Sequence, residues 1–253
     1  TKIDDEAGLR AAYETSGTKI MHLQAGVIPY EFFVRCVGLG PQTRVVNYDP
    51  GAPLHDRYRM DRGFLTAQQQ SELEDITLTI NAFFGWDFNS CEALRRDGVF
   101  HPIDFANACP DSQVTSLHYH FPWLLRAKLK WSIFVAATRR RMRKNLDWEP
   151  FFEIAATEAP FAEKLSRYAR LAHQRFESDR FVEFCARHLA HLDGEVWEFF
   201  GTPLAKDAVR KKVEALYPAH EVEQFTEHCW GLIQFWRKTE GEFLPSRKGG
   251  SSA

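Results

Sequence analysis

The sequence predicts an α+β protein, in which an antiparallel sheet with packed helices is followed by an all-α region. Residues 84–111 read as two short strands joined by an Asp97-Gly98 turn, and Asp-Gly between β-forming segments is a strong hairpin signal. Beyond Pro122 the apolar side chains show only the spacing that is typical of helices. We therefore expect a first domain over residues 1–115, a helical domain over 116–245 and a disordered tail over 246–253.

Individual elements follow from capping residues and from the spacing of apolar side chains. In the first half we expect a helix over 5–15, strands over 19–24, 32–37 and 44–48, a helix over 66–83 with Thr66 as its N-cap, and hairpin strands over 85–94 and 99–105. In the second half we expect helices over 123–144, 148–173 with a break at Pro160, 178–200 capped by Ser178, 203–216 and 220–239.

The composition excludes some partners. There are 32 basic and 34 acidic side chains, so bulk charge gives no reason to expect nucleic acid or a membrane as partner. The most apolar windows, such as residues 131–137, are far shorter than the ~18 residues that cross a bilayer. The five cysteines are odd in number and lack Cys-x-x-Cys spacing, which predicts reduced thiols in a cytoplasm.

The predicted hairpin brings together three oxygen-bearing side chains. Glu92 lies in its first strand, and Asp104 and Asn107 lie at the end of its second strand. Two carboxylates and an amide form the kind of oxygen-rich set that binds Mg²⁺, so we predict a magnesium site. In the alternative interpretation Asp104 and Asn107 only shape a turn, and Glu92 pairs with a neighbouring arginine.

The order Gly85, Glu92, Asp104, Asn107, Pro110 resembles the C-terminal part of an ATP-grasp ligase. In that family one residue usually separates the second acid from the asparagine, whereas two separate them here. The second strand must therefore bulge if Asn107 is a ligand.

Residues 21–37 are similar to the hinge region of the same family. The resemblance implies that Gln24 lies at the adenine, that Glu31 contacts the ribose hydroxyls and that Arg35 contacts the phosphates. Together with the hairpin, the resemblance covers less than half of the chain.

Two further groups of residues have more than one interpretation. Arg57 and Arg59 lie in a loop over residues 48–62, where guanidinium groups could bind phosphate or an anionic substrate, or could pair with aspartates of the same loop. His118 and His120 share a face if their segment is extended. They could belong to a zinc site, bind substrate, or be hydrogen-bonded core residues, and no third zinc ligand has a recognisable spacing.

The resemblance implies an ATP- and Mg²⁺-dependent ligase that activates a carboxylate as an acyl-phosphate for attack by an amine. Its substrate would be a small carboxylate or a peptide. The family also has an earlier subdomain that covers the triphosphate, and nothing before Thr1 supplies it in this sequence. We therefore expect either a fragment of a longer ligase or a reduced relative. The alternative function is a non-catalytic ATP-grasp remnant that binds a protein partner through its helical half.

Overall fold

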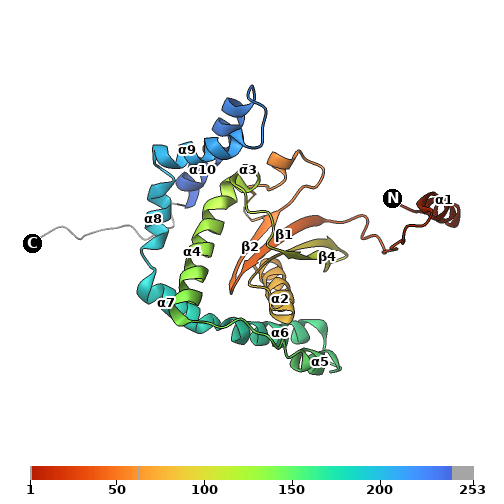
Figure 1. The fold of residues 1–253 in the computed structure, drawn as a ribbon. Coiled ribbons are helices and arrows are strands. Elements are labelled where there is room, and N and C mark those ends of the chain that lie inside the picture. The colour runs from red at the N-terminus through yellow and green to blue at the C-terminus, as the bar shows by residue number, and fades with distance from the viewer. Residues whose placement is uncertain (1, 62, 241–253) are drawn as a thin grey trace, which may run out of the picture.

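A computed structural model describes residues 2–61 and 63–240. As predicted, the fold is α+β and contains a four-stranded antiparallel sheet with packed helices (Figure 1). The spatial order of the strands is β2-β1-β3-β4. Their bounds are β1 Phe32–Leu39, β2 Gln42–Asn47, β3 Phe88–Arg96 and β4 Val99–Ala108. The predicted tail over 246–253 lies outside the described residues.

Two tight turns fix how the strands pair. Between β3 and β4, Asp97 and Gly98 have φ values of 51° and 79°, the positive values that a two-residue hairpin turn requires. Between β1 and β2, Gly40 has φ +56°, and a Cβ atom there would lie 2.5 Å from the Trp131 ring. Pro102 is accommodated because β4 is an edge strand, where a missing N–H breaks no ladder.

One face of the sheet packs on the helix α2 (Ala67–Phe84), and we call it the α2 face. Thr66 begins this helix with a capping box, as its position predicted. Leu73 and Ile76 of α2 pack there against a cluster that includes Val34 of β1 and Cys91 of β3. The hydrophobic effect of this burial holds helix and sheet together.

The opposite face carries Arg35, Ser90 and Glu92, and we call it the site face. Near the β1–β2 turn it is covered by α4 (Phe121–Thr138), whose Trp131 and Phe134 share one hydrophobic cluster with sheet residues. That cluster therefore joins residues from both sides of position 115. The division into domains at residue 115 stays a prediction.

The second half is helical, as predicted. Its elements are α3 Val114–Leu117, the 3₁₀ turn η2 His118–His120, α4, α5 Glu149–Ala155, α6 Phe161–Phe176, α7 Ser178–His188, α8 Leu192–Phe199, α9 Pro203–Glu214 and α10 Val222–Glu240. A second hydrophobic cluster includes residues of α3, α8, α9 and α10. The break predicted at Pro160 is present between α5 and α6.

Two predicted helix bounds in this half are wrong. The helix expected over 178–200 is two helices separated at residues 189–191, and Ser178 makes no cap there because Glu177 is the N-cap. The helix expected to reach 144 ends at Thr138, because Arg139 adopts a left-handed conformation with φ 52°.

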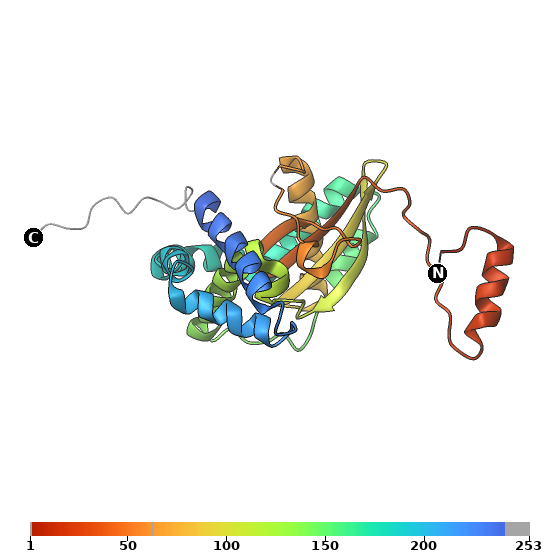
Figure 2. The same ribbon diagram turned by 90° about the horizontal axis from the view of Figure 1, so that it is seen from above.

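The N-terminal segment projects from the body of the molecule (Figures 1 and 2). It contains α1 (Glu6–Ser16), which confirms the predicted helix and is capped by the Asp5 side chain. The strand predicted over 19–24 is wrong. A strand needs neighbours for its N–H and C=O groups, and this segment lies away from the sheet.

Among the described residues, no helix has the length and apolar character needed to cross a membrane. All five cysteines fall within the described ranges and are free thiols.

Candidate functional site

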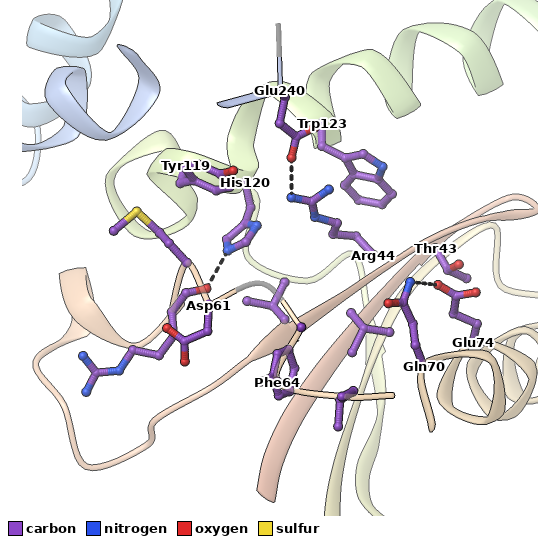
Figure 3. A pocket seen from close by; sticks show the side chains of 16 residues that line it. Thr43, Arg44, Asp61, Phe64, Gln70, Glu74, Tyr119, His120, Trp123 and Glu240 are labelled. Atoms are coloured by element: carbon purple, nitrogen blue, oxygen red, sulfur yellow. Dashed lines mark hydrogen bonds and ion pairs between the residues drawn. The ribbon is translucent and has the colours of Figure 1, made fainter. Parts of the chain in front are cut away.

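Two regions around the sheet gather polar side chains. The first is a cavity of about 400 Å³ at the edge of β2, lined by residues of β2, α2, η2, α4 and α10 and by residues 59–61 and 63–65 (Figure 3). Several polar side chains of its lining pair with each other: Arg44 contacts Glu240 at 2.8 Å, and Gln70 donates to Glu74 at 2.9 Å. The second region, on the site face, combines more unusual features.

The second region lies where β4 loses its regular register with β3, which shifts between Ser90 and Glu92 and again between Glu92 and Ala93. Glu92 lies directly opposite Asp104, and Ser90 lies opposite Asn107, so at this point two residues of β4 face one residue of β3. In a regular strand, positions 104 and 107 would point to opposite faces because side chains alternate. The extra residue places Asp104 and Asn107 on the same face. The bulge that the sequence required is therefore present.

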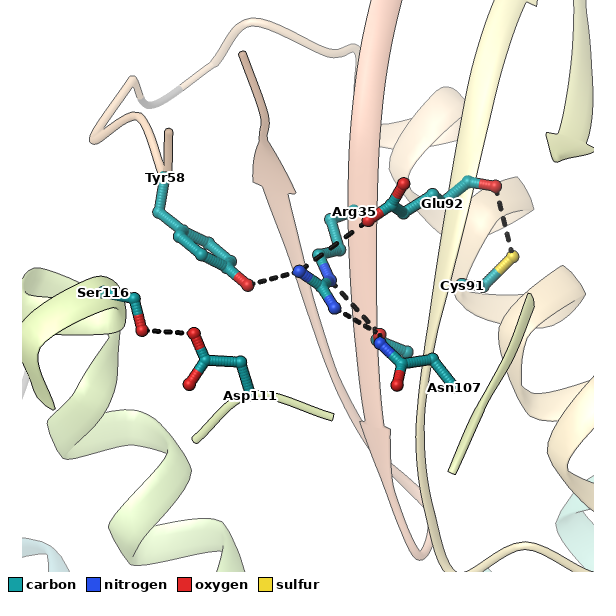
Figure 4. A network of polar contacts seen from close by, with 8 residues as sticks. Arg35, Tyr58, Cys91, Glu92, Asn107, Asp111 and Ser116 are labelled. Atoms are coloured by element: carbon teal, nitrogen blue, oxygen red, sulfur yellow. Dashed lines mark hydrogen bonds and ion pairs between the residues drawn. The ribbon is translucent and has the colours of Figure 1, made fainter. Parts of the chain in front are cut away.

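Arg35 lies at the centre of this region (Figure 4). It is opposite Glu92 in the β1–β3 pairing, which places both side chains on the site face. Its Nε and Nη2 groups donate to the Ser90 hydroxyl at 3.2 and 3.0 Å, and Nη1 donates to the Tyr58 hydroxyl. The nearest Glu92 oxygen is 3.7 Å from Nη1, a looser contact than a hydrogen-bonded ion pair.

Apart from the loose ion pair with Glu92, the charge of Arg35 is surrounded by neutral groups. The residue is only 7% exposed, and its guanidinium carbon lies 5.6 Å from the ring centres of both Tyr48 and Tyr58. An arginine side chain has five N–H donors, and hydroxyl oxygens accept three of them. A buried cation held mainly by hydroxyl groups is costly unless an anion approaches it. The region is therefore suited to an anionic ligand.

Glu92 and Asp104 place two carboxylates side by side. Burial raises the pKa of Glu92; Arg35 opposes this shift, Asp104 adds to it, and Arg57 opposes it. Like charges on directly opposite residues destabilise a sheet. A divalent cation between the two carboxylates would remove that repulsion, since hard cations prefer oxygen ligands.

The loop over residues 48–59 forms one wall of the site. A β-bridge pairs Tyr48 with Tyr58 at its base. His118 donates from Nε2 to the His55 carbonyl at 3.1 Å, and His120 donates to the Arg59 carbonyl at 2.9 Å. The two histidines therefore hold the loop to η2, which agrees with their interpretation as hydrogen-bonded core residues.

The protonation state of His118 suits this role. Its Nδ1 accepts the Tyr119 backbone N–H at 2.7 Å, so its single proton resides on Nε2. Burial, with a smaller contribution from the neighbouring His228, lowers the pKa of His118 to about 4. The imidazole is neutral near pH 7, and the loop stays attached.

Of the two predicted loop arginines, only Arg57 lies near the site. Its Nε donates to the Ala52 carbonyl, and its charge reaches Glu92. Arg59 instead forms an exposed ion pair with Asp49 at 2.6 Å, which is the alternative interpretation of this loop.

Gln24 and Glu31 are not brought to Arg35. Gln24 lines a cavity formed entirely by residues 2–29 of the N-terminal segment. Glu31 pairs with Arg95, which lies opposite Phe32 and therefore on the α2 face. Glu31 also precedes Arg35 by four residues, which corresponds to roughly 13 Å along an extended chain.

Sequence reasoning missed Ser90 and Tyr58. Ser90 could have been found, because it precedes Glu92 by two residues and so shares its face. Tyr58 had no such signal, since its contact with Arg35 depends on how the loop folds back over the sheet.

Within residues 2–61 and 63–240, no group of three or more His, Cys, Asp or Glu side chains is placed to hold a metal ion. A magnesium site here thus relies on two carboxylates and an amide. Comparisons with models of protein families, with curated proteins and with solved structures find no match to this chain.

Proposed function

We propose that the site face is the magnesium- and phosphate-binding part of an ATP-grasp-like ligase that activates a carboxylate with ATP. One observation carries the proposal: the register of three strands lines up Arg35, Glu92 and Asp104 on one face. A buried guanidinium next to a pair of carboxylates matches the needs of a phosphate chain and its cation.

The residues fit Mg²⁺ by their chemistry. Mg²⁺ is usually held by one or two carboxylates together with substrate phosphates, rather than by a complete protein cage. Glu92 and Asp104 would supply the carboxylates, and the amide oxygen of Asn107 would supply a third ligand. When bound, the ion would supply positive charge that offsets the negative charge of the phosphate chain.

The chain's own residues would mainly orient and stabilise charge. In the proposed reaction the γ-phosphoryl group of ATP passes to the substrate carboxylate and ADP leaves; an amine then displaces phosphate from the acyl-phosphate. Arg35, already held by Ser90 and Tyr58, would stabilise negative charge on the phosphate oxygens without reorganising. No protein nucleophile is needed, since such catalysis is mostly positioning and electrostatics.

A second candidate function, a module that binds a protein partner through the helical half, is favoured by one observation. An apolar cavity of about 300 Å³ lies between α3, α4, α8 and α9, and Phe121, Phe199 and Val209 are among its lining residues. Apolar cavities of this kind accept side chains of a partner. This function does not need the site face.

The test compares the wild-type chain with the double variant Glu92→Gln/Asp104→Asn in calorimetric titrations with Mg·ATP. We expect the double variant to lose at least about 100-fold in affinity, because charged hydrogen-bonding partners contribute about 1.5 to 3 kcal/mol each. Asp97→Asn is the matched control, since its carboxylate lies in the turn of the same hairpin and pairs with Arg96. Unchanged affinity in the double variant would contradict the proposal and leave the binding module.

A further inference from the structure

The Ser90 hydroxyl is the point where the two halves of the site face meet. Its oxygen accepts from Arg35 through Nε and Nη2 at 3.2 and 3.0 Å, and from Asn107 through Nδ2 at 3.3 Å. The residue has no solvent exposure. A single buried oxygen thus contacts both the phosphate-side arginine and the metal-side amide.

This arrangement decides which end of the Asn107 amide is available. An asparagine side chain has an NH₂ group that donates and a carbonyl oxygen that accepts, and only the oxygen can bind a cation. Because Nδ2 donates to Ser90, Oδ1 is the end left for a metal ion. Loss of the Ser90 oxygen would let the amide turn over.

The same oxygen fixes the plane of the Arg35 guanidinium. Two of its N–H groups converge on Ser90, and Tyr58 accepts from Nη1 on the other side (Figure 4). A planar group held at both ends has no freedom to rotate about its last bonds, so its remaining N–H groups keep one direction.

We propose that Ser90 is a positioning residue that couples Arg35 to Asn107, with Tyr58 as the second support of Arg35. The inference rests on the proposed function. Among the described residues, the Ser90 hydroxyl has hydrogen-bond contacts with these two side chains and with no backbone group, so its role concerns the site rather than the sheet ladder.

The test measures two ligands separately on the full chain: Mn²⁺ alone, by electron paramagnetic resonance, and Mg·ADP, by calorimetry. Ser90→Ala should weaken both by about 10-fold, the loss of one hydrogen bond to a charged or ligating group. Asn107→Ala should weaken Mn²⁺ binding, and adding it to Ser90→Ala should cause little further loss, because both act through the same amide. Thr226→Val, which removes a buried hydroxyl in α10, is the control.

A readout without ligand accompanies these titrations. In ¹⁵N NMR spectra, the Arg35 Nε–H and the Asn107 side-chain amide should both exchange faster with water in Ser90→Ala than in wild type. Tyr58→Phe, which keeps the ring and the fold, should weaken Mg·ADP by about 3- to 10-fold and leave Mn²⁺ unchanged. This second variant tests the support of Arg35 even if Ser90→Ala does not fold.

The outcomes are distinguishable. Equal affinities in wild type and Ser90→Ala, or fully additive effects of Ser90→Ala and Asn107→Ala, overturn the inference while the proposed function stands. A wild-type chain that binds neither Mn²⁺ nor Mg·ADP overturns the proposed function, and the inference with it.

Discussion

The two faces of the sheet both contain buried polar groups, but on the α2 face these groups are neutral, whereas on the site face they are charged. On the α2 face, the Asn89 amide donates to Asn81 at 2.8 Å and to the Phe105 carbonyl at 2.9 Å. Cys36 and Cys91 lie opposite each other there, and burial raises the pKa of both thiols, so they remain neutral. The centre of this face is therefore a neutral core.

The site face instead carries charged groups, at strand positions next to Cys36 and Cys91. Arg35 and Glu92 approach only to 3.7 Å, and Asp104 adds a second negative charge beside Glu92. Such an arrangement adds little to folding, since buried charges are costly unless closely paired. The α2 face therefore contributes a neutral packed core, whereas the charged groups of the site face support the proposal that it binds a ligand.

The largest effect on stability should come from the α2 face. Leu73→Ala removes a side chain that is 1% exposed and packs in the cluster of Val34 and Cys91. We expect a loss of about 2 to 5 kcal/mol in the free energy of unfolding, measured by urea denaturation. Glu92→Gln on the site face is the comparison. Equal losses in the two variants would break the contrast between the faces.

The loop over the site face should respond to acid through His118. Its pKa in the folded chain, about 4, is below its ordinary value of 6.5. The stability that the neutral imidazole provides is therefore complete above pH 6.5 and lost as the pH falls through about 4; it amounts to roughly 3 kcal/mol. NMR titration of the imidazole C–H signals measures this pKa. A midpoint near 6.5 would show that the loop is not attached as described.

A smaller effect should follow from Glu92. Its pKa is raised in the folded chain, so the stability linked to its neutral form is present below its ordinary value of 4.5 and lost as the pH rises through the folded value. Glu92→Gln should therefore increase stability at pH 7 by up to about 1 kcal/mol, because it removes a partly buried charge and, with it, the repulsion from Asp104. Asp97→Asn in the exposed turn is the matched control. A clear destabilisation by Glu92→Gln would show that its charge supports the fold.

The smallest perturbation probes the neutral core directly. Burial raises the pKa of the Cys91 thiol to about 12, so iodoacetamide should leave it unmodified at pH 8, whereas the exposed Cys109 should react. Mass spectrometry of peptides after short labelling distinguishes the two. Comparable labelling of Cys91 and Cys109 would mean that the α2 face opens readily.

Local signals predicted much of the fold. Asp97-Gly98 predicted the β3–β4 hairpin, Thr66 predicted the start of α2, and Pro160 predicted the break before α6. Each acts within a few residues through backbone geometry or capping. The strand expected over 19–24 failed because a strand depends on a distant partner, and the helix end at Arg139 was missed because a left-handed arginine has no sequence signal.

The same distinction applies to the site. The alternation of residues in the hairpin, with a bulge between Asp104 and Asn107, was enough to predict that Glu92, Asp104 and Asn107 share one face. The contact between Arg35 and Tyr58 joins positions 23 residues apart, and no local pattern predicts it. The pairing of Glu31 with Arg95 was not predicted for a similar reason, because it depends on the register between β1 and β3.

The central claim is that one divalent cation binds between the carboxylates of the site face. Titration of the ¹⁵N-labelled chain with Mn²⁺ in the presence of ADP tests it most directly, since the paramagnetic ion broadens nearby amide signals. We predict that the signals of residues 92, 104 and 107 broaden first and that excess Mg²⁺ restores them. Broadening that begins around Asp61 and Glu74 at the β2 cavity, or that spreads evenly over the surface, would contradict the account.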